Sequence, residues 1–185
     1  MLVGNRVVLR TLRHKDLDYL YDLMADVRAM GDYWTPNIES EIKRRKRIEE
    51  TGDWGEDRGL LLITDRTDRI LGQIFFFRPA SYLNAYELAY RIYEAEDWGQ
   101  GYTGEAVSLL VAYLFETRPV DRIQATTLPG NLGSQGVLKK CGFQFEGIMR
   151  QAIFHRGQAQ DLHLFALVRG EQQPLAELLA PLQPE

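Results

Sequence analysis

The nine residues Trp98-Gly-Gln-Gly-Tyr-Thr-Gly-Glu-Ala106 connect an apolar segment with the pattern of a strand, Leu88–Tyr93, to a segment with the pattern of a helix, Thr103–Glu116. The first turn of a helix leaves several backbone N–H groups without partners and carries about half a positive charge. Glycine at positions 99, 101 and 104 removes the side chains that would keep a bulky anion from those donors. The stretch therefore predicts a binding site for a pyrophosphate.

Two kinds of nucleotide site contain a loop of this type. Gly99-x-Gly101-x-x-Gly104 satisfies the fingerprint G-x-G-x-x-G of proteins that bind nicotinamide or flavin dinucleotides. That fingerprint follows its strand directly, and an acid that binds the ribose follows about 20 residues later. Here the linker Glu94-Ala-Glu-Asp97 separates the strand from the first glycine, and no convincing strand-borne acid stands at the required distance. A nucleotide-dependent oxidoreductase is therefore the weaker alternative.

Composition restricts the class of protein. The chain has 185 residues, of which 45% are apolar and 26% charged, and these values suit one soluble globular domain. A net charge of −4 disfavours nucleic acid as the main partner. The single cysteine, Cys141, excludes an internal disulfide, and His14, His155 and His163 have no metal-ligand spacing. Without a signal peptide or an apolar run of about 18 residues, we expect a cytoplasmic protein that does not enter the membrane.

Strand and helix patterns alternate along the chain. We expect strands over residues 6–11, 59–65, 70–77, 86–93, 122–127, 147–155 and 161–168, and helices over 16–25, 39–50, 103–116 and 131–140. Such an order predicts an α/β fold, with a mixed central sheet of about seven strands and helices on both faces. Within the second helix, the basic run Lys43–Arg47 is flanked by acids and lacks interleaved aromatics, which favours a solvated helix face over a nucleic-acid site.

Residues 1–170 are expected to form the domain, followed by a tail over 171–185. Leucines in the tail have the spacing of a short amphipathic helix; they are Leu175, Leu178, Leu179 and Leu182. This helix packs on its own domain or forms a dimer contact, so a monomer and a homodimer both stay open.

The loop and its surroundings resemble the GNAT acetyltransferases, and in particular their RimJ/RimL-like branch. The acyl-CoA loop of that family reads Q/R-x-x-G-x-G/A, and in this branch often W-G-x-G-Y-x-x-E-A. The resemblance covers about residues 5–170 and includes Glu87-Leu-Ala-Tyr90-Arg-Ile92, Asn131-x-x-Ser134, Leu138-Lys-Lys-Cys-Gly-Phe143, Glu146-Gly147, Gly157 and Asp161. Thr103 departs from the pattern, which has glycine or alanine there; its hydroxyl would donate to the anion or cap the helix.

The resemblance implies a GNAT fold and an acyl-CoA-dependent N-acyltransferase that uses acetyl-CoA as cosubstrate and a primary amine as acceptor. It further implies that the backbone of Ile92 and Tyr93 pairs with the pantetheine arm, and that Asn131 and Ser134 contact the cosubstrate. The backbone N–H groups implied to bind the pyrophosphate are those of Gln100, Gly101, Tyr102, Thr103 and Gly104. No metal is implied.

Two residues are candidates for catalysis. Glu87 is the candidate general base, acting on the substrate ammonium through a water, because a carboxylate in a partly desolvated cleft suits a base near neutrality. Strand alternation directs Glu87 and Arg91 to one face of the sheet and Tyr90 to the other. Ser134 would protonate the CoA thiolate or serve only in binding, since Leu138 occupies the position where many family members carry a tyrosine acid. The alternative role for Glu87 is a surface or salt-bridged glutamate.

The acceptor is the part of the reaction that the residues determine least. Tyr33, Trp34 and His155 are candidates for the acceptor pocket, with core packing or a structural role as the alternative for each. We expect a protein N-terminus or a small-molecule amine as acceptor. An enzyme that detoxifies an antibiotic or toxin is the alternative, and a non-catalytic acyl-CoA-binding module is the alternative of another class.

Overall fold

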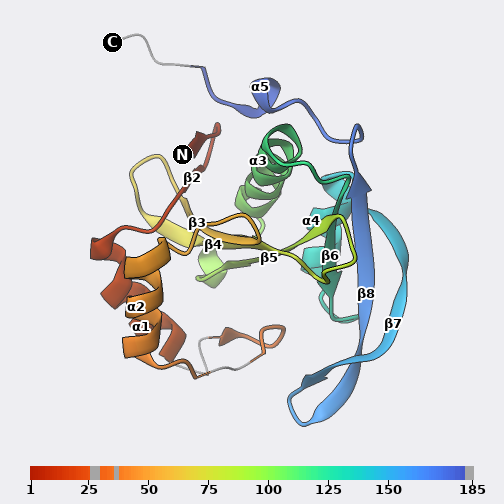
Figure 1. Ribbon diagram of the computed structural model, residues 1–185, viewed down its shortest axis with the longest axis horizontal. Coiled ribbons are helices and arrows are strands. Elements are labelled where there is room, and N and C mark those ends of the chain that lie inside the picture. Colours follow the sequence, from red (N-terminus) through yellow and green to blue (C-terminus); the bar gives the residue numbers. More distant parts are fainter. Residues whose placement is uncertain (26–29, 36–37, 182–185) are drawn as a thin grey trace.

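A mixed sheet of eight strands runs through the molecule, in the order β1-β2-β3-β4-β5-β6-β8-β7 (Figure 1). The computed structural model describes residues 1–25, 30–35 and 38–181. Neighbouring strands pair antiparallel, except that β5 and β6 run parallel. The strands are β1 Leu2–Val3, β2 Val8–Arg10, β3 Arg58–Thr64, β4 Ile70–Phe77, β5 Ala85–Ile92, β6 Arg122–Thr127, β7 Gln144–His155 and β8 Gln158–Val168. The expected α/β fold is confirmed, and the two-residue β1 is the strand that the sequence patterns did not predict.

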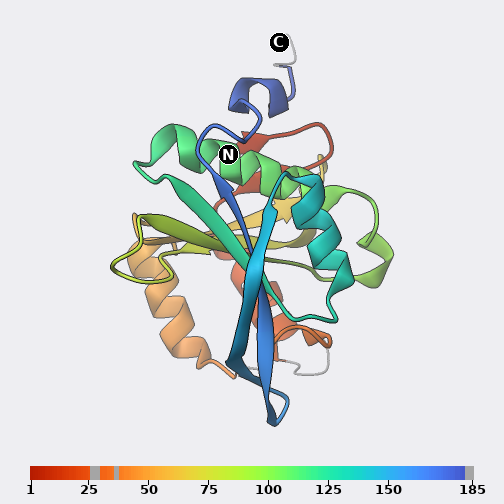
Figure 2. The ribbon, with the colours of Figure 1, turned by 90° about the vertical axis from the view of Figure 1, so that its right-hand side faces the viewer.

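Helices cover both faces of the sheet. Figures 1 and 2 show α3 and α4 on one side and α1 and α2 on the other. The short 3₁₀ turns η1 and η3 precede α1 and the glycine-rich loop, respectively. The helical elements are η1 His14–Asp16, α1 Leu17–Ala25, α2 Glu41–Thr51, η3 Ala95–Asp97, α3 Tyr102–Thr117, α4 Leu132–Lys140 and α5 Leu175–Leu178.

Two apolar cores form on the two faces of the sheet, because side chains alternate along each strand. The larger core lies beneath α3 and α4 and includes Ile74 and Phe76 of β4, both fully buried. The smaller core joins Leu60 and Leu62 of β3 to Leu20 of α1. The sheet is therefore fixed from both sides, and its central strands offer a rigid support for a site.

Helix α3 is held by the apolar stripe that its sequence predicts. Each residue of that stripe is at most 2% exposed; the members are Val107, Leu110, Val111, Leu114 and Phe115. This packing fixes the first turn of α3 beside the end of β5, where the glycine-rich loop enters the helix.

The basic run Lys43–Arg47 is not a uniformly solvated helix face, and that prediction is wrong for Arg44. Helix α2 begins after Ser40, whose hydroxyl caps it by accepting the backbone N–H of Lys43. Residues three and four apart share one side of a helix, so Arg44, Arg47 and Ile48 lie together. The side chains on this side of the helix include two buried ones, since Ile48 is 7% exposed and Arg44 is 6% exposed.

The closing hairpin of β7 and β8 is longer than predicted, since both strands begin three residues earlier. A bulge between Met149 and Ile153 interrupts the pairing, and Gln151 there adopts a left-handed φ of +50°. The Asp161 carboxylate accepts the backbone N–H of Gln151 at 2.8 Å. Asp161 therefore stabilises the bulge.

The C-terminal tail returns over α3 towards the N-terminal strands. Leu175 and Leu178 of α5 pack against the larger core, and Ala180 donates its backbone N–H to the Val3 carbonyl at 2.8 Å. Leu182 lies outside the described residues, and both the domain boundary at 170 and a dimer contact stay predictions. Within the described part of the chain, no helix has the length and apolar character needed to cross a membrane.

Candidate active site

Strands β5 and β6 separate part-way along their length. Three consecutive residue pairs join them, and the last of these pairs Glu87 with Gln124. Strand β5 nevertheless continues to Ile92 and β6 to Thr127. The two strands therefore open into a V-shaped space, called the β5–β6 gap below, with Glu87 and Gln124 at its vertex. Strand edges without partners offer backbone hydrogen bonds to an extended ligand.

The β5 side of the gap presents the backbone of Ile92. The next residue, Tyr93, donates its N–H to the Leu71 carbonyl at 2.9 Å and so continues the pairing with β4. Because neighbouring residues of a strand direct their backbone groups to opposite edges, those of Ile92 face the gap. The Ile92 carbonyl accepts the indole N–H of Trp98 at 3.3 Å. Of the two predicted pantetheine-pairing residues, Ile92 is the one whose backbone reaches the gap.

The glycine-rich loop begins α3 as the sequence predicts. Gly99 and Gly101 have φ values of +74° and +84°, a conformation that favours glycine, and Gly101 is the N-cap without any capping side chain. The first helical N–H with a partner is that of Glu105, which bonds to the Gly101 carbonyl at 3.2 Å. Among the described residues, the N–H groups of Tyr102, Thr103 and Gly104 have no partner, so they are available to an anion. Thr103 does not cap the helix.

Two guanidinium groups lie beside this loop and add positive charge to it. An open cavity of about 430 Å³ is lined by Arg6 and Arg66, by one carboxylate, that of Asp65, and by Thr67, Gln100 and Tyr102. Arg6 Nη1 donates to the Gln100 carbonyl at 2.7 Å, which holds the loop in place. A site with helix N–H groups and neighbouring arginines fits a phosphate-bearing ligand.

Glu87 stands half-buried at the vertex of the gap, and two side chains of β6 hold its carboxylate. Gln124 Nε2 donates to Oε2 at 2.9 Å, and Thr126 Oγ1 donates to Oε1 at 2.7 Å. Neither partner is charged, and among the described residues no Lys, Arg or His forms a salt bridge with Glu87. It is a fixed carboxylate at the opening between the strands, a geometry that suits a general base.

A chain of hydrogen bonds extends from this carboxylate to the hairpin. Gln124 Oε1 accepts from Arg122 Nε at 3.1 Å, which orients the Gln124 amide with its NH₂ group towards Glu87. Arg122 in turn pairs through both of its Nη atoms with Glu146 and lowers the pKa of the Glu146 carboxyl. The orientation of Glu87 thus depends on β6 and β7 as well as on its own strand.

The other face of β5 presents hydroxyl groups to the gap. The Tyr90 hydroxyl lies 2.8 Å from Ser134 Oγ of α4, and burial raises the pKa of Tyr90, so this group is a neutral hydroxyl. Ser134 is positioned by Asn131, the N-cap of α4, whose side-chain oxygen accepts the Ser134 N–H at 3.1 Å. The sequence expectation that Glu87 and Tyr90 face opposite sides is met by these contacts. Leu138 is fully buried in the core.

The candidates for the acceptor pocket lie on the Glu87 side of the sheet. Trp34 packs edge-to-face on Phe75 of β4, with ring centroids 6.1 Å apart, and both line a cavity of about 700 Å³. Tyr33 is half exposed and its hydroxyl donates to the Gly130 carbonyl at 2.8 Å. Trp34 is therefore placed to contact a ligand, whereas Tyr33 ties its loop to the segment before α4.

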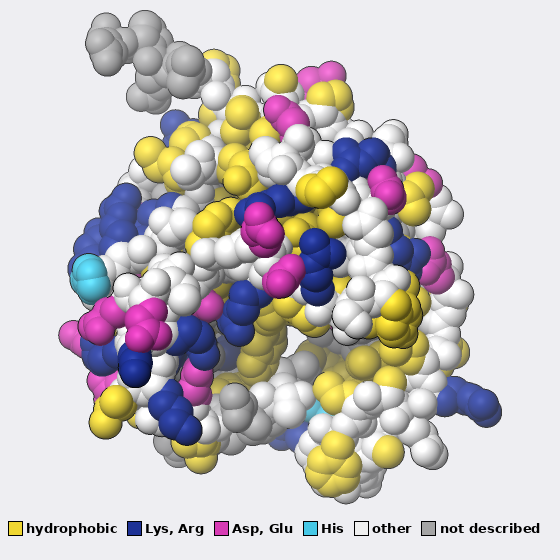
Figure 3. Space-filling view, in the orientation of Figure 1, with side chains coloured by type: hydrophobic (Ala, Val, Ile, Leu, Met, Phe, Trp, Pro, Cys, Tyr) yellow, Lys and Arg dark blue, Asp and Glu magenta, His cyan; other side chains and the backbone are white. Residues whose placement is uncertain are grey.

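His155 makes contacts through both of its ring nitrogens, and its role in the acceptor pocket stays a prediction. It is 6% exposed, Nε2 lies 2.7 Å from the Asp32 carbonyl, and Nδ1 lies 3.4 Å from Thr35 Oγ1. Both ring nitrogens therefore join the tip of the β7–β8 hairpin to the loop before α2. In Figure 3 this face of the molecule is hollowed between the α1–α2 side and the hairpin.

Sequence reasoning did not identify Gln124 and Thr126, or the partnership of Tyr90 with Ser134. The partners of Glu87 lie 37 and 39 residues further along the chain. The alternation of the polar side chains at positions 122, 124 and 126 with the apolar Ile123 and Ala125 is the signal that could have indicated them.

Comparison with protein families matches residues 6–144 to the acetyltransferase (GNAT) domain. The probable N-acetyltransferase YjcK of Bacillus subtilis (strain 168) is 29% identical over 183 residues, which cover 94% of this chain and 99% of that protein. The ribosomal protein uS5-alanine N-acetyltransferase of Escherichia coli (strain K12) is 28% identical over 182 residues, 94% of this chain and 93% of that one.

Solved structures share the fold. The spermidine N-acetyltransferase from Vibrio cholerae, in complex with CoA and spermine, has a TM-score of 0.77 and 19% identity to this chain. The match covers 89% of this chain and 96% of that one.

Proposed function

The chain belongs to the acetyltransferase (GNAT) family, and we propose that it transfers an acetyl group from acetyl-CoA to a primary amine by direct attack in a ternary complex. The main support is the β5–β6 gap. It has the Glu87 carboxylate on one face and the Ser134–Tyr90 hydroxyl pair on the other. A thioester held in the gap would meet an amine from the first face and release its thiolate towards the second.

The residues present fit acetyl-CoA. The free N–H groups at the start of α3, with Arg6 and Arg66 nearby, would hold the pyrophosphate, and the edge of β5 at Ile92 would hold the pantetheine arm. Asn131 and Ser134 complete the set on the α4 side. Acetyl-CoA supplies a reactive thioester, so the protein has to bind, orient and move protons rather than activate the acyl group.

Glu87 is proposed to take the proton of the substrate ammonium through a water. Gln124 and Thr126 each donate one hydrogen bond to the carboxylate, so each of its oxygens keeps a lone pair for a water. A neutral amine can then attack the acetyl carbonyl. The fixed orientation of the base is the contribution of the β6 side chains.

Ser134 is proposed to bind the cosubstrate on the thiolate side. Its hydroxyl shares a hydrogen bond with the Tyr90 hydroxyl, and a hydroxyl can also donate to a sulfur or to a pantetheine carbonyl. Protonation of the thiolate by Ser134 is the alternative role. Ser134→Ala separates the two roles, because lost binding raises KM and a lost acid lowers kcat.

The acceptor is proposed to be a protein N-terminus or a small-molecule amine. Among the proteins similar to this chain, one is named as an alanine N-acetyltransferase of ribosomal protein uS5 and another as a spermidine N-acetyltransferase. Detoxification of an antibiotic or toxin stays the alternative. A cytoplasmic location, the absence of nucleic acid as a partner, and the choice between monomer and homodimer stay predictions.

An acyl-transfer assay tests the proposal. The full chain is mixed with acetyl-CoA and a panel of primary amines, among them peptides with N-terminal alanine or serine, and spermidine. We expect amine-dependent release of CoA and a mass-shifted acetylated product. Binding of acetyl-CoA without release for any amine would instead indicate a non-catalytic acyl-CoA-binding module, and binding of NAD would indicate the oxidoreductase alternative.

A further inference from the structure

The cavity on the acceptor side of the sheet is built from polar and charged side chains as much as from aromatic ones. Its volume of about 700 Å³ suits a small ligand. Trp34 and Phe75 form an aromatic wall, and Leu60 and Gln73 contribute from the neighbouring strands β3 and β4. The charged side chains that line it are Glu39, Lys43, Arg44, Arg47, Asp53 and Arg58.

Cations outnumber carboxylates in this lining by four to two, in a chain whose net charge is −4. Glu39 pairs with Arg47 at 2.5 Å and with Arg44 at 3.6 Å. Asp53 pairs with Arg58 at 3.3 Å and with Arg47 at 3.6 Å. Each carboxylate is therefore shared between two arginines, and the cavity keeps a net positive charge.

Two of these arginines are withdrawn from water, Arg44 as a whole side chain and Arg47 at its Nε atom. Arg44 is 6% exposed, and its burial lowers the pKa of its guanidinium because desolvation disfavours the charged form. The Nε atom of Arg47 is buried and has no hydrogen-bond partner among the described residues. Such a donor is rare in folded proteins, and its nearest carboxylate oxygen, Asp53 Oδ1, is 3.6 Å away, beyond hydrogen-bond distance.

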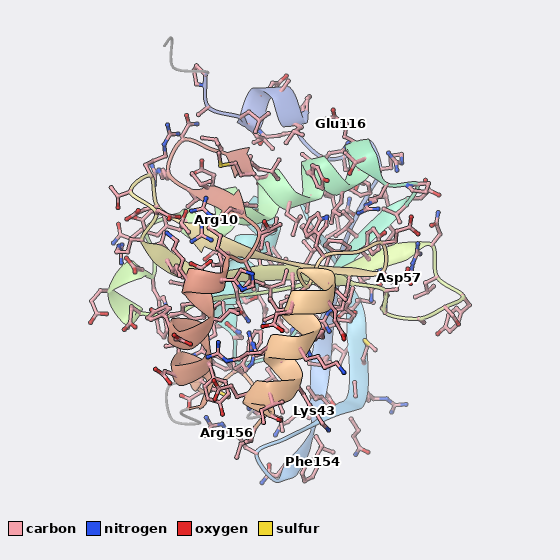
Figure 4. The ribbon with its side chains drawn as sticks, turned by 60° about the vertical axis from the view of Figure 1, so that its left-hand side comes forward. Arg10, Lys43, Asp57, Glu116, Phe154 and Arg156 are labelled. Atoms are coloured by element: carbon pink, nitrogen blue, oxygen red, sulfur yellow. The ribbon has the colours of Figure 1, made fainter. Side chains whose placement is uncertain are left out.

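The positive lining lies within reach of the proposed base. Strand register places Arg58 of β3 opposite Phe77 of β4, and Phe77 opposite Glu87 of β5, all in one row across the sheet. Two strand spacings separate the Arg58 and Glu87 backbones by roughly 10 Å. In Figure 4, Lys43 is near the N-terminal end of α2, on the side of the molecule where the hairpin residues Phe154 and Arg156 also lie.

We propose that the acceptor amine carries an anionic group, a carboxylate or a phosphate, which binds in this cavity among Lys43, Arg47 and Arg58 while the amine lies at Glu87. This inference rests on the proposed acetyl transfer and adds the class of acceptor. An anion would accept hydrogen bonds from the guanidinium and ammonium groups and balance the surplus charge. A polycationic amine would instead meet like charges, which disfavours polyamines as acceptors.

Three amines of equal length test the charge preference directly. They are 8-aminooctanoate, octylamine and 1,8-diaminooctane, which differ only in the group remote from the reacting amine. We expect kcat/KM with acetyl-CoA to be at least about tenfold higher for 8-aminooctanoate than for octylamine, and lowest for the diamine. Two peptides that carry either acidic or amide side chains near the N-terminus are compared in the same way. A higher kcat/KM for the acidic peptide would assign the anion to a polypeptide, and equal values would assign it to a free small molecule.

Variants locate the preference in the cavity. Lys43→Gln and Arg58→Gln should each reduce the ratio of kcat/KM for 8-aminooctanoate to that for octylamine. Lys46→Gln is the matched control, since Lys46 lies on the same helix, is exposed, and does not line the cavity. The control should keep the wild-type ratio.

Binding of the acceptor amines is measured as well as their turnover, so that the charge preference can be read even from an amine that is not acetylated. Calorimetry with CoA present should show tighter binding of 8-aminooctanoate than of 1,8-diaminooctane. Equal or stronger binding and turnover of the diamine would overturn the inference while leaving acetyl transfer intact. Failure of acetyl-CoA itself to bind would overturn the proposed function, a result that the same titration distinguishes.

Discussion

Glutamine at position 87 would remove the proposed base while leaving its surroundings in place. Glutamine has the shape of glutamate, and its amide oxygen can accept from Gln124 as the carboxylate does. Its NH₂ group can donate to the Thr126 hydroxyl, which now accepts instead of donating. Glu87→Gln therefore keeps both contacts, and we expect its free energy of unfolding to change by less than about 1 kcal/mol.

The same substitution should lower kcat by about 100- to 10,000-fold, the usual contribution of a positioned general base. Michaelis constants for acetyl-CoA should change little, because the residues proposed to hold it are on α3, β5 and α4. The fall in kcat is expected because, without the base, the substrate amine stays a protonated ammonium, which has no lone pair with which to attack the thioester.

Steady-state release of CoA, followed by a thiol reagent, measures this effect. The chain contributes one slow background thiol, Cys141, because burial raises its pKa. Glu116→Gln is the control: Glu116 is exposed near the end of α3, away from the gap (Figure 4). If Glu87→Gln retained wild-type kcat across the pH range in which the protein is folded, the assignment of Glu87 as the base would be refuted.

Three further predictions concern the cosubstrate site and stability. Ser134→Ala should raise KM for acetyl-CoA several-fold at an almost unchanged kcat, and a fall in kcat at constant KM would assign it the acid role instead. Gly101→Ala should cost about 1–2 kcal/mol, because φ is +84° there and the new Cβ would lie 3.1 Å from Arg6 Nη1. This corresponds to a melting point roughly 2–8 °C lower, with weaker acetyl-CoA binding, and calorimetry that showed neither would contradict it. Hydrogen bonds from Lys15 and Arg10 lower the pKa of Asp68 to about 2, below its value of about 4 in an unfolded chain. The stability that this lowered pKa provides is present above about pH 4 and is lost as the pH falls towards 2. In chemical denaturation between these two pH values, Asp68→Asn should therefore lose less stability than the wild type. An equal loss in both proteins would contradict this role of Asp68.

Local patterns were sufficient to predict the elements that carry the site. Glycines before an apolar helical stripe predicted the start of α3, and alternation along β5 predicted that Glu87 and Tyr90 lie on opposite faces. Both features depend on residues close together in the chain, where backbone geometry leaves few alternatives.

Contacts between distant segments could not be predicted in the same way. Gln124 and Thr126 reach Glu87 because β5 and β6 run parallel for three residue pairs, a pairing between segments 37 residues apart in the chain. The burial of Arg44 similarly depends on α2 lying against the sheet, although its spacing from Arg47 and Ile48 contained the signal. Charged residues near an apolar helix face therefore merit a test for burial before they are assigned to solvent.

The identity of the ligand at the glycine-rich loop is the central claim, and a thermal-shift comparison of acetyl-CoA, CoA and NAD at matched concentrations tests it most directly. A ligand at about 100 times its Kd adds about 2.7 kcal/mol of stability, which for a chain of this size raises the melting point by roughly 5–10 °C. We predict such a shift with acetyl-CoA and with CoA, and none with NAD. A shift with NAD alone, or no shift with either CoA compound, would contradict the account.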